Sequence, residues 1–238
     1  MTTYASQKFQ CFMCGAVHEF KVLASTNSFG PADLDLRPGP MKRWTMDTWV
    51  QECPECGYVS DIISDYTEIT PEFLKSEAYL SCNGINFKSK LAVLFYRRYL
   101  IMQKHDYTEA QFDAALQAAW CCDDENDPEN AIRCRELAIP LLTEMIASEK
   151  EYLDDMPSDL NQTSRILVRR TEKLNNYLLM KADLLRRAGH FDRLIEEYEN
   201  VRFSDPLLDR ILAFEIEKAK QEDTNRYSVR DVTMNDPR

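Results

Sequence analysis

The chain has 238 residues, of which 44% are hydrophobic and 11% aromatic, and this composition is typical of a globular protein rather than a disordered one. Lys and Arg number 29 against 40 Asp and Glu, giving a net charge of −11, which opposes nonspecific binding to nucleic-acid phosphates. The N-terminal residues are polar, and no apolar run approaches the roughly 18 residues of a membrane span. We therefore expect a cytoplasmic protein without a membrane segment, in a reducing setting where paired cysteines are more often metal ligands than disulfides.

Two Cys-x-x-Cys-Gly motifs, at residues 11–15 and 53–57, carry the strongest chemical signal in the chain. A tight turn of this kind aims two sulfurs at one point, and its glycine lets the backbone turn beneath them. Two such turns supply four soft ligands, which suits tetrahedral zinc and leaves no open position for a substrate. The motifs predict one structural Zn²⁺ held by Cys11, Cys14, Cys53 and Cys56.

The spacing of the two motifs leaves an alternative open. Residues 15–52 separate them, whereas simple zinc ribbons have a gap of about 15–20 residues. The intervening loop must therefore carry extra structure, or the two pairs serve separate purposes. A redox pair is the rival interpretation, but it requires a helix that starts at the motif, and neither motif opens a helical pattern.

Residues 1–69 are predicted to form a small β zinc-ribbon domain. Residues 17–22 alternate apolar and polar side chains and predict a strand leaving the first motif. Residues 46–51 predict a strand entering the second motif, and residues 58–63 a strand leaving it. A strand, a cysteine turn and a second strand, repeated twice, is how a zinc ribbon is built.

The loop at residues 27–40, punctuated by Gly-Pro and Pro-Gly-Pro, contains Asp33, Asp35 and Arg37. These charges predict a recognition site, a buried ion pair or an acidic surface loop, and the sequence does not decide among the three. Trp44 and Trp49 are expected to pack over the zinc module, with an exposed binding face as the alternative.

Residues 70–221 are predicted to be antiparallel helical hairpins, followed by a tail at 222–238 without strong periodicity, so the fold class is α+β and mostly α. Helix starts are predicted at Thr70-Pro71, Thr108, Asp127-Pro128 and Asp205-Pro206. Pro140 is expected to kink or end its helix, and residues 154–164 to form a connection. Buried thiols are expected at Cys82, Cys121, Cys122 and Cys134.

The segment from Leu178 to Pro206 resembles a tetratricopeptide repeat, a 34-residue helix–turn–helix unit. Ala182 occupies the small position where the two helices cross, and Gly189 falls in the turn. A weaker match runs from Ala115 to about Thr143, with Ala119, Ala131 and Ala138 at its three small positions. Two matches are fewer than a solenoid usually needs, so an ordinary bundle of helical hairpins is the alternative.

Taken whole, the chain resembles an uncharacterised bacterial family known as a domain of unknown function, whose members join two Cys-x-x-Cys motifs to tetratricopeptide-like helices. The resemblance implies zinc and helical repeats, and it implies no activity. It is carried by Cys11, Cys14 and the segments 53–58, 29–38 and 181–189.

No phosphate loop, nucleophile elbow or paired-carboxylate motif is present in the sequence, so we expect no catalytic residue and no cofactor besides zinc. The chain is predicted to be a non-enzymatic interaction protein that binds a protein or peptide through its helical array. Arginine pairs on the helices would line a groove for acidic peptides, or be solvated and salt-bridged. The runner-up is a nucleic-acid-associated regulatory zinc protein, and a third class is a hydrolase with a metal site not visible in the sequence. The arginine pairs are Arg97-Arg98, Arg169-Arg170 and Arg186-Arg187.

Overall fold

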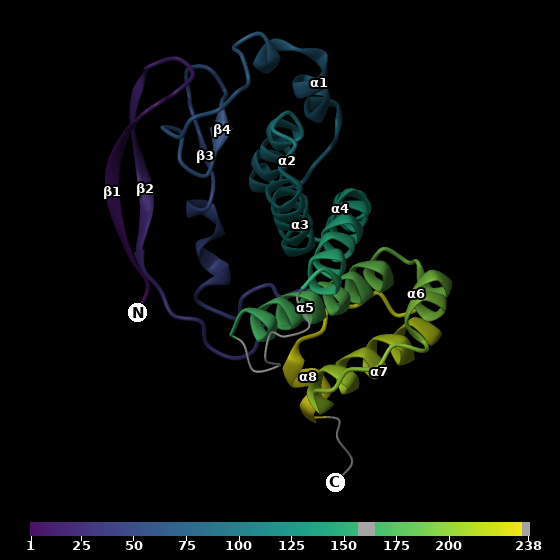
Figure 1. The fold of residues 1–238 in the computed structure, drawn as a ribbon. Coiled ribbons are helices and arrows are strands. Elements are labelled where there is room, and N and C mark those ends of the chain that lie inside the picture. The colour runs from purple at the N-terminus through teal and green to yellow at the C-terminus, as the bar shows by residue number, and fades with distance from the viewer. Residues whose placement is uncertain (157–164, 235–238) are drawn as a thin grey trace. The chain divides into compact units, whose positions relative to one another are not determined.

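The structure, a computed structural model, describes residues 1–156 and 165–234 (Figure 1). Most of these residues are helical, and the strands form two small antiparallel sheets near the N-terminus, which confirms the predicted α+β, mostly α class. Contacts divide the chain into two compact units. Unit 1 contains residues 1–30 and 38–138, and unit 2 contains residues 31–37 and 139–238.

Two hairpins in unit 1 carry the cysteine motifs. Strands β1 (Thr3–Gln10) and β2 (Val17–Ser25) pair over their full length, and the first motif forms their turn. Strands β3 (Gln51–Glu52) and β4 (Val59–Ser60) pair around the second motif. The predicted strand at 17–22 is therefore confirmed, while the strand predicted at 58–63 shrinks to two residues.

The strand predicted at residues 46–51 is wrong over most of its length. Residues Arg43–Thr48 form a 3-10 helix, η1, and only Gln51 joins a strand. The Thr45 hydroxyl donates to the Lys42 carbonyl at 2.8 Å and accepts from the Trp49 indole N–H at 3.0 Å. Such local side-chain bonds compete with a strand ladder.

The tryptophan packing predicted over the zinc module fails for Trp44. Its side chain is 67% exposed, whereas Trp49 is half-buried against η1. Trp44 starts its turn of η1 by donating its N–H to the Met41 carbonyl at 3.2 Å, and the short helix then directs the indole to solvent.

The helix start predicted at Thr70-Pro71 is also wrong. Residues 70–76 form a turn and the 3-10 helix η2 (Phe73–Lys75), because Ser76 is extended and interrupts the helical path. Ser76 then caps the short α1 (Glu77–Leu80) by accepting the Tyr79 N–H at 3.3 Å. The start predicted at Thr108 is confirmed. The remaining helices of unit 1 are η3 (Ser81–Gly84), α2 (Lys90–Met102), α3 (Thr108–Asp124) and the first part of α4 (Pro128–Asp154).

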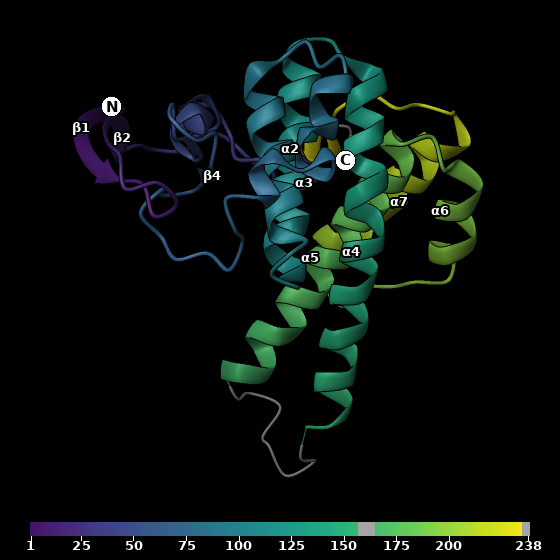
Figure 2. The same ribbon diagram turned by 90° about the horizontal axis from the view of Figure 1, so that it is seen from above.

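The core of unit 2 lies among α5, α6 and α7 (Figures 1 and 2). The predicted start at Asp205-Pro206 is confirmed, since the Asp205 carboxylate accepts the Leu207 N–H at 2.7 Å. Leu179, Leu184, Leu194 and Leu212 fill the interior. The helices of unit 2 are the last part of α4, α5 (Arg165–Arg187), α6 (Phe191–Tyr198), α7 (Pro206–Lys220) and α8 (Val229–Met234).

Pro140 was expected to kink or end its helix, and helix α4 does not end there. It starts at Pro128, as predicted, and continues to Asp154. Pro140 removes only one main-chain donor, and the buried Ile139 and Leu142 beside it keep this turn packed. Residues 157–164, most of the predicted connection, lie outside the described residues.

The features of the better repeat match are present in unit 2. Ala182 is fully buried in α5, and Gly189 has φ +83° in the turn before α6, a conformation that favours glycine. Ala119, Ala131 and Ala138, the small positions of the weaker match, are also buried. The assignment to a tetratricopeptide repeat stays a prediction.

Because Ala182 is fully buried in α5, which packs on α6 and α7, Ala182→Leu is expected to lower the free energy of unfolding by roughly 1–3 kcal/mol through overpacking. Denaturant melts measure the effect. Ala147→Leu, on an exposed position of α4 in the same unit, is the control. Equal stability of the two variants would contradict the proposed crossing.

A short strap, residues 31–37, belongs to unit 2 although its flanking residues belong to unit 1. Leu34 N–H donates to the Tyr227 carbonyl at 3.0 Å, and Val229 N–H donates to the Ala32 carbonyl at 3.1 Å. Within the tail predicted at 222–238, residues 227–229 are thus hydrogen-bonded to the strap and residues 229–234 form α8, with Val232 buried. The division into units differs from the boundaries predicted at residues 69 and 221, which stay predictions about folding domains.

No helix within residues 1–156 and 165–234 combines the length and apolarity needed to cross a membrane.

Candidate functional site

The two cysteine motifs adopt the same backbone turn. In the first, the Cys11 N–H donates to the Ala16 carbonyl and the Gly15 N–H donates to the Cys11 carbonyl, both at 2.8 Å. The second motif closes with the same two bonds around Cys53, at 2.8 and 2.9 Å. Gly15 and Gly57 have φ of +76° and +71°, which explains why glycine follows each motif.

These turns bring four sulfurs together from residues separated by up to 45 positions. The four Sγ atoms lie within 4.8 Å of one another. Cys11 and Cys56 have their sulfurs 3.7 Å apart, and those of Cys14 and Cys53 are 3.6 Å apart. Four sulfurs about 2.3 Å from one ion are separated by about 3.8 Å in a tetrahedron, whereas a disulfide needs about 2.05 Å. The donor set therefore fits one tetrahedral metal ion.

Burial and main-chain donors act in opposite directions on these thiols. Cys11 and Cys53 are buried, Cys56 is half-buried and Cys14 is exposed. Burial raises the pKa of Cys11 and that of Cys56. Burial also acts on Cys53, but N–H groups of Cys56 and Glu55 aimed at its sulfur outweigh it and lower its pKa. The turn thus already stabilises a thiolate at Cys53.

Bonds to neighbouring segments fix the two turns within unit 1. The Phe12 N–H donates to the Ile63 carbonyl at 2.8 Å, and the Ile63 N–H donates to the Gln51 side chain at 3.0 Å. The hydroxyl of the buried Tyr79 donates to the Gly57 carbonyl at 2.7 Å. These bonds join the first motif, the second hairpin and the helical layer of unit 1, and so they help to orient the cysteines.

The other four cysteines are buried, as predicted, and none joins this group. Cys122 of α3 lies beside Cys134 of α4, and this neighbour together with burial raises the pKa of Cys122. Cys82 donates to the Tyr79 carbonyl at 3.3 Å. These four buried side chains fill the packing between helices.

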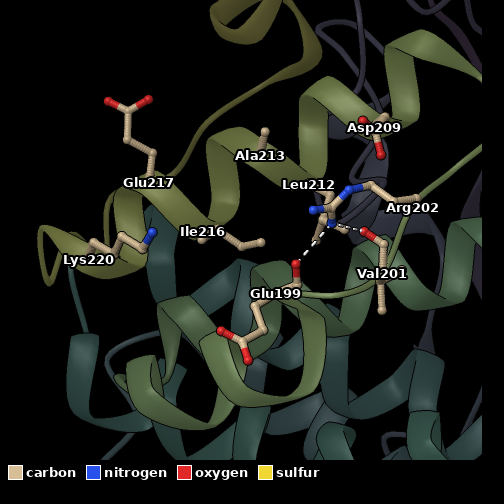
Figure 3. Close-up of a pocket in the computed structure, with 9 residues that line it drawn as sticks. All are labelled: Glu199, Val201, Arg202, Asp209, Leu212, Ala213, Ile216, Glu217 and Lys220. Atoms are coloured by element: carbon tan, nitrogen blue, oxygen red, sulfur yellow. Dashed lines mark hydrogen bonds between the residues drawn. The ribbon is translucent and has the colours of Figure 1, made fainter.

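A second candidate site is a groove of about 440 Å³ in unit 2, between the end of α6 and helix α7 (Figure 3). Leu212 and Ile216 project from α7 toward it, and Val201 closes it from the loop after α6. Arg202 Nη1 shapes that loop by donating to the carbonyls of Glu199 at 2.9 Å and Val201 at 2.6 Å. The groove has an apolar floor and a rim of mixed charge.

Sequence reasoning did not identify this groove. Its floor combines residues 201–216 with the end of α6, and these segments meet only through the packing of α6 on α7. The apolar spacing of Leu212 and Ile216 was the available signal, but the same spacing is typical of residues facing a core. Leu212 is indeed buried, whereas Ile216 is half-exposed.

The pair Arg186-Arg187 does not line a groove for acidic peptides, because both side chains are buried. Arg186 is fully buried, with its Nε 2.5 Å from Glu215, and Arg187 is 6% exposed. The alternative of salt-bridged pairs is borne out at five positions. Ion pairs join Arg97 to Glu52, Arg98 to Asp61, Arg170 to Glu149, Arg186 to Glu215 and Arg187 to Asp35.

The strap residue Asp35 takes part in one of these ion pairs. Its carboxylate is fully buried, lies 3.0 Å from Arg187 Nη1 and accepts the Arg37 N–H at 3.1 Å. Asp183 of α5 lies 2.7 Å from Arg186, so acids and arginines alternate through the interior. Of the three alternatives for the 27–40 loop, the buried ion pair is the one observed.

Comparison with known proteins found no relative of this chain. No family model matches the chain, and no curated protein or solved structure is significantly similar to it. The resemblance to the uncharacterised bacterial family therefore stays a prediction.

Proposed function

We propose that Cys11, Cys14, Cys53 and Cys56 bind one structural Zn²⁺. Sulfur–sulfur separations of 3.6 and 3.7 Å match a tetrahedral site, and four thiolates are the ligands of closed zinc sites. Four protein ligands leave no position for a substrate or water. The ion would hold the two hairpins of unit 1 together and take no part in turnover.

We further propose that the protein binds a segment of a protein partner in the groove of unit 2, as a non-enzymatic adaptor. The observation that supports this proposal is the apolar floor of the groove, formed by Val201, Leu212 and Ile216 inside a charged rim (Figure 3). Peptide-binding clefts combine an apolar floor with few polar groups that orient the ligand. The groove is large enough for one or two apolar side chains of a partner.

Replacing Ile216 with Asp places a charge on the groove floor, and we expect it to reduce partner binding at least tenfold. The purified chain serves as bait, and partners are quantified by mass spectrometry against the same bait carrying Ile216→Asp. Ile166→Asp is the matched control, because Ile166 is 56% exposed in α5 of the same unit and outside the groove.

Circular dichroism first establishes that both variants fold. Partners lost with Ile216→Asp and kept with Ile166→Asp support the groove. Partners captured equally by the two variants would contradict it.

A further inference from the structure

Two aromatic rings stand exposed beside the first cysteine motif. Phe12 is 46% exposed and Tyr66 is 73% exposed, and their rings meet edge to face with centroids 5.3 Å apart. Single exposed apolar residues are ordinary, but this pair presents a joint aromatic surface. Ile62, at 39% exposure, lies in the same segment as Tyr66. We call Phe12 and Tyr66 the aromatic patch.

The aromatic patch is held rigidly by the backbone around it. Phe12 lies between Cys11 and Cys14, and its N–H donates to the Ile63 carbonyl at 2.8 Å. Tyr66 directly follows a turn in which the Asp65 N–H donates to the Ile62 carbonyl at 3.0 Å. Because these side chains are positioned before binding, a partner would lose little entropy in ordering them.

The chain segment that carries Tyr66 has charged side chains of one sign. Residues 53–72 contain five Asp and Glu and no Lys or Arg. Asp61 is neutralised by Arg98 at 2.5 Å, whereas no ion pair within the described residues involves Asp65 or Glu68, which are exposed. Glu55 of the second motif is also largely exposed, and its carboxylate lies 4.0 Å from His18. The segment that carries Tyr66 is therefore acidic, and we call Asp65 and Glu68 the acidic rim.

We propose that the aromatic patch is a docking surface for a basic protein segment, one that places an aromatic or aliphatic side chain against Phe12 and Tyr66 and lysines or arginines against Asp65 and Glu68. Aromatic anchors inside a charged rim are typical of binding hot spots, and opposite charges select the partner. A nucleic acid is disfavoured because the acidic rim repels phosphate. This surface lies in unit 1, and the argument for it does not use the groove of unit 2.

The test uses the full chain, purified without chelator, and a phage-displayed library of random dodecapeptides. Enriched peptides are synthesised with a fluorophore, and their affinities are measured by anisotropy. The patch variants are Tyr66→Ala and Asp65→Lys. Their matched controls are Tyr107→Ala, at a tyrosine 67% exposed in α3's N-terminal turn, and Glu125→Lys, at an exposed glutamate in the same unit.

We expect the enriched peptides to carry net positive charge and at least one large apolar residue. Tyr66→Ala and Asp65→Lys should each weaken binding at least tenfold, while both controls and Ile216→Asp leave it unchanged. Enrichment of acidic or neutral peptides, no enrichment at all, or equal loss with patch and control variants would overturn the proposal. Self-association of the chain that Tyr66→Ala abolishes would assign the patch to a second copy and overturn it as well.

Discussion

Replacing Cys56 with serine is expected to unfold both cysteine turns and their strands, while α5, α6 and α7 keep their structure. Binding of structural zinc contributes on the order of 10 kcal/mol to the folding of small modules. Without the ion, the first hairpin has little support, since β1 is almost entirely exposed, and the second keeps a ladder of two residues and its contact with α2. Unit 2 has its own apolar core and contains none of the four sulfurs.

Hydrogen exchange followed by mass spectrometry measures this effect. Residues 9–25 and 50–63 should lose protection in Cys56→Ser, and residues 178–220 should retain it. Cys121→Ala is the control, since Cys121 is a buried cysteine outside the sulfur cluster, and its metal content and protection of the turns should match those of the parent chain. Loss of protection throughout Cys56→Ser would show that the two units fold as one.

Replacing Asp35 with alanine is expected to destabilise unit 2 by about 3 kcal/mol, because removing one partner of a buried ion pair leaves the other charge less well compensated. Arg187 keeps a second carboxylate, that of Asp183, at 3.9 Å. Asp35 is fully buried, and Arg187 beside it is 6% exposed, so water cannot replace the lost carboxylate. The substitution also removes the acceptor of the Arg37 N–H. The strap 31–37 would then separate from residues 227–229, to which Leu34 and Ala32 are hydrogen-bonded.

Hydrogen exchange of the slowest amides in α5 and α7 reports this loss as a free energy of opening. Arg187→Met and the double variant complete a thermodynamic cycle, in which we expect the double variant to be more stable than the sum of the single effects predicts. Asp47→Ala, which breaks the exposed pair with Lys21, should change stability little. A similarly small effect of Asp35→Ala would contradict the buried pair.

The cysteine turns were predictable from sequence because their geometry is local. Spacing and the following glycine determine the turn in both motifs, and the observed φ angles of Gly15 and Gly57 confirm why glycine is needed. Helix starts at Pro128 and Pro206 were predictable for the same reason, since an aspartate cap and the fixed φ of proline act within one turn. Helix α3 starts at Thr108 as predicted, but its N-cap is Tyr107, which makes no side-chain cap bond, so the predicted capping box is not the cause.

Features that depend on distant contacts were not predictable. Asp35 and Arg187 are separated by 152 positions, and nothing in either local sequence indicates the other. The strap joins unit 2 through two main-chain hydrogen bonds to the tail. Such bonds cannot be predicted from the hydrophobic periodicity of the sequence. The 3-10 helix at Arg43–Thr48 replaces a predicted strand because Thr45 bonds locally to Lys42, a competition that alternation of apolar residues cannot reveal.

Zinc K-edge X-ray absorption on the chain purified without chelator tests the metal centre most directly. The account predicts one zinc per chain with a first shell of four sulfurs at about 2.3 Å, supplied by Cys11, Cys14, Cys53 and Cys56. Absence of a zinc edge, or a shell that contains nitrogen or oxygen in place of one or more sulfurs, would contradict it.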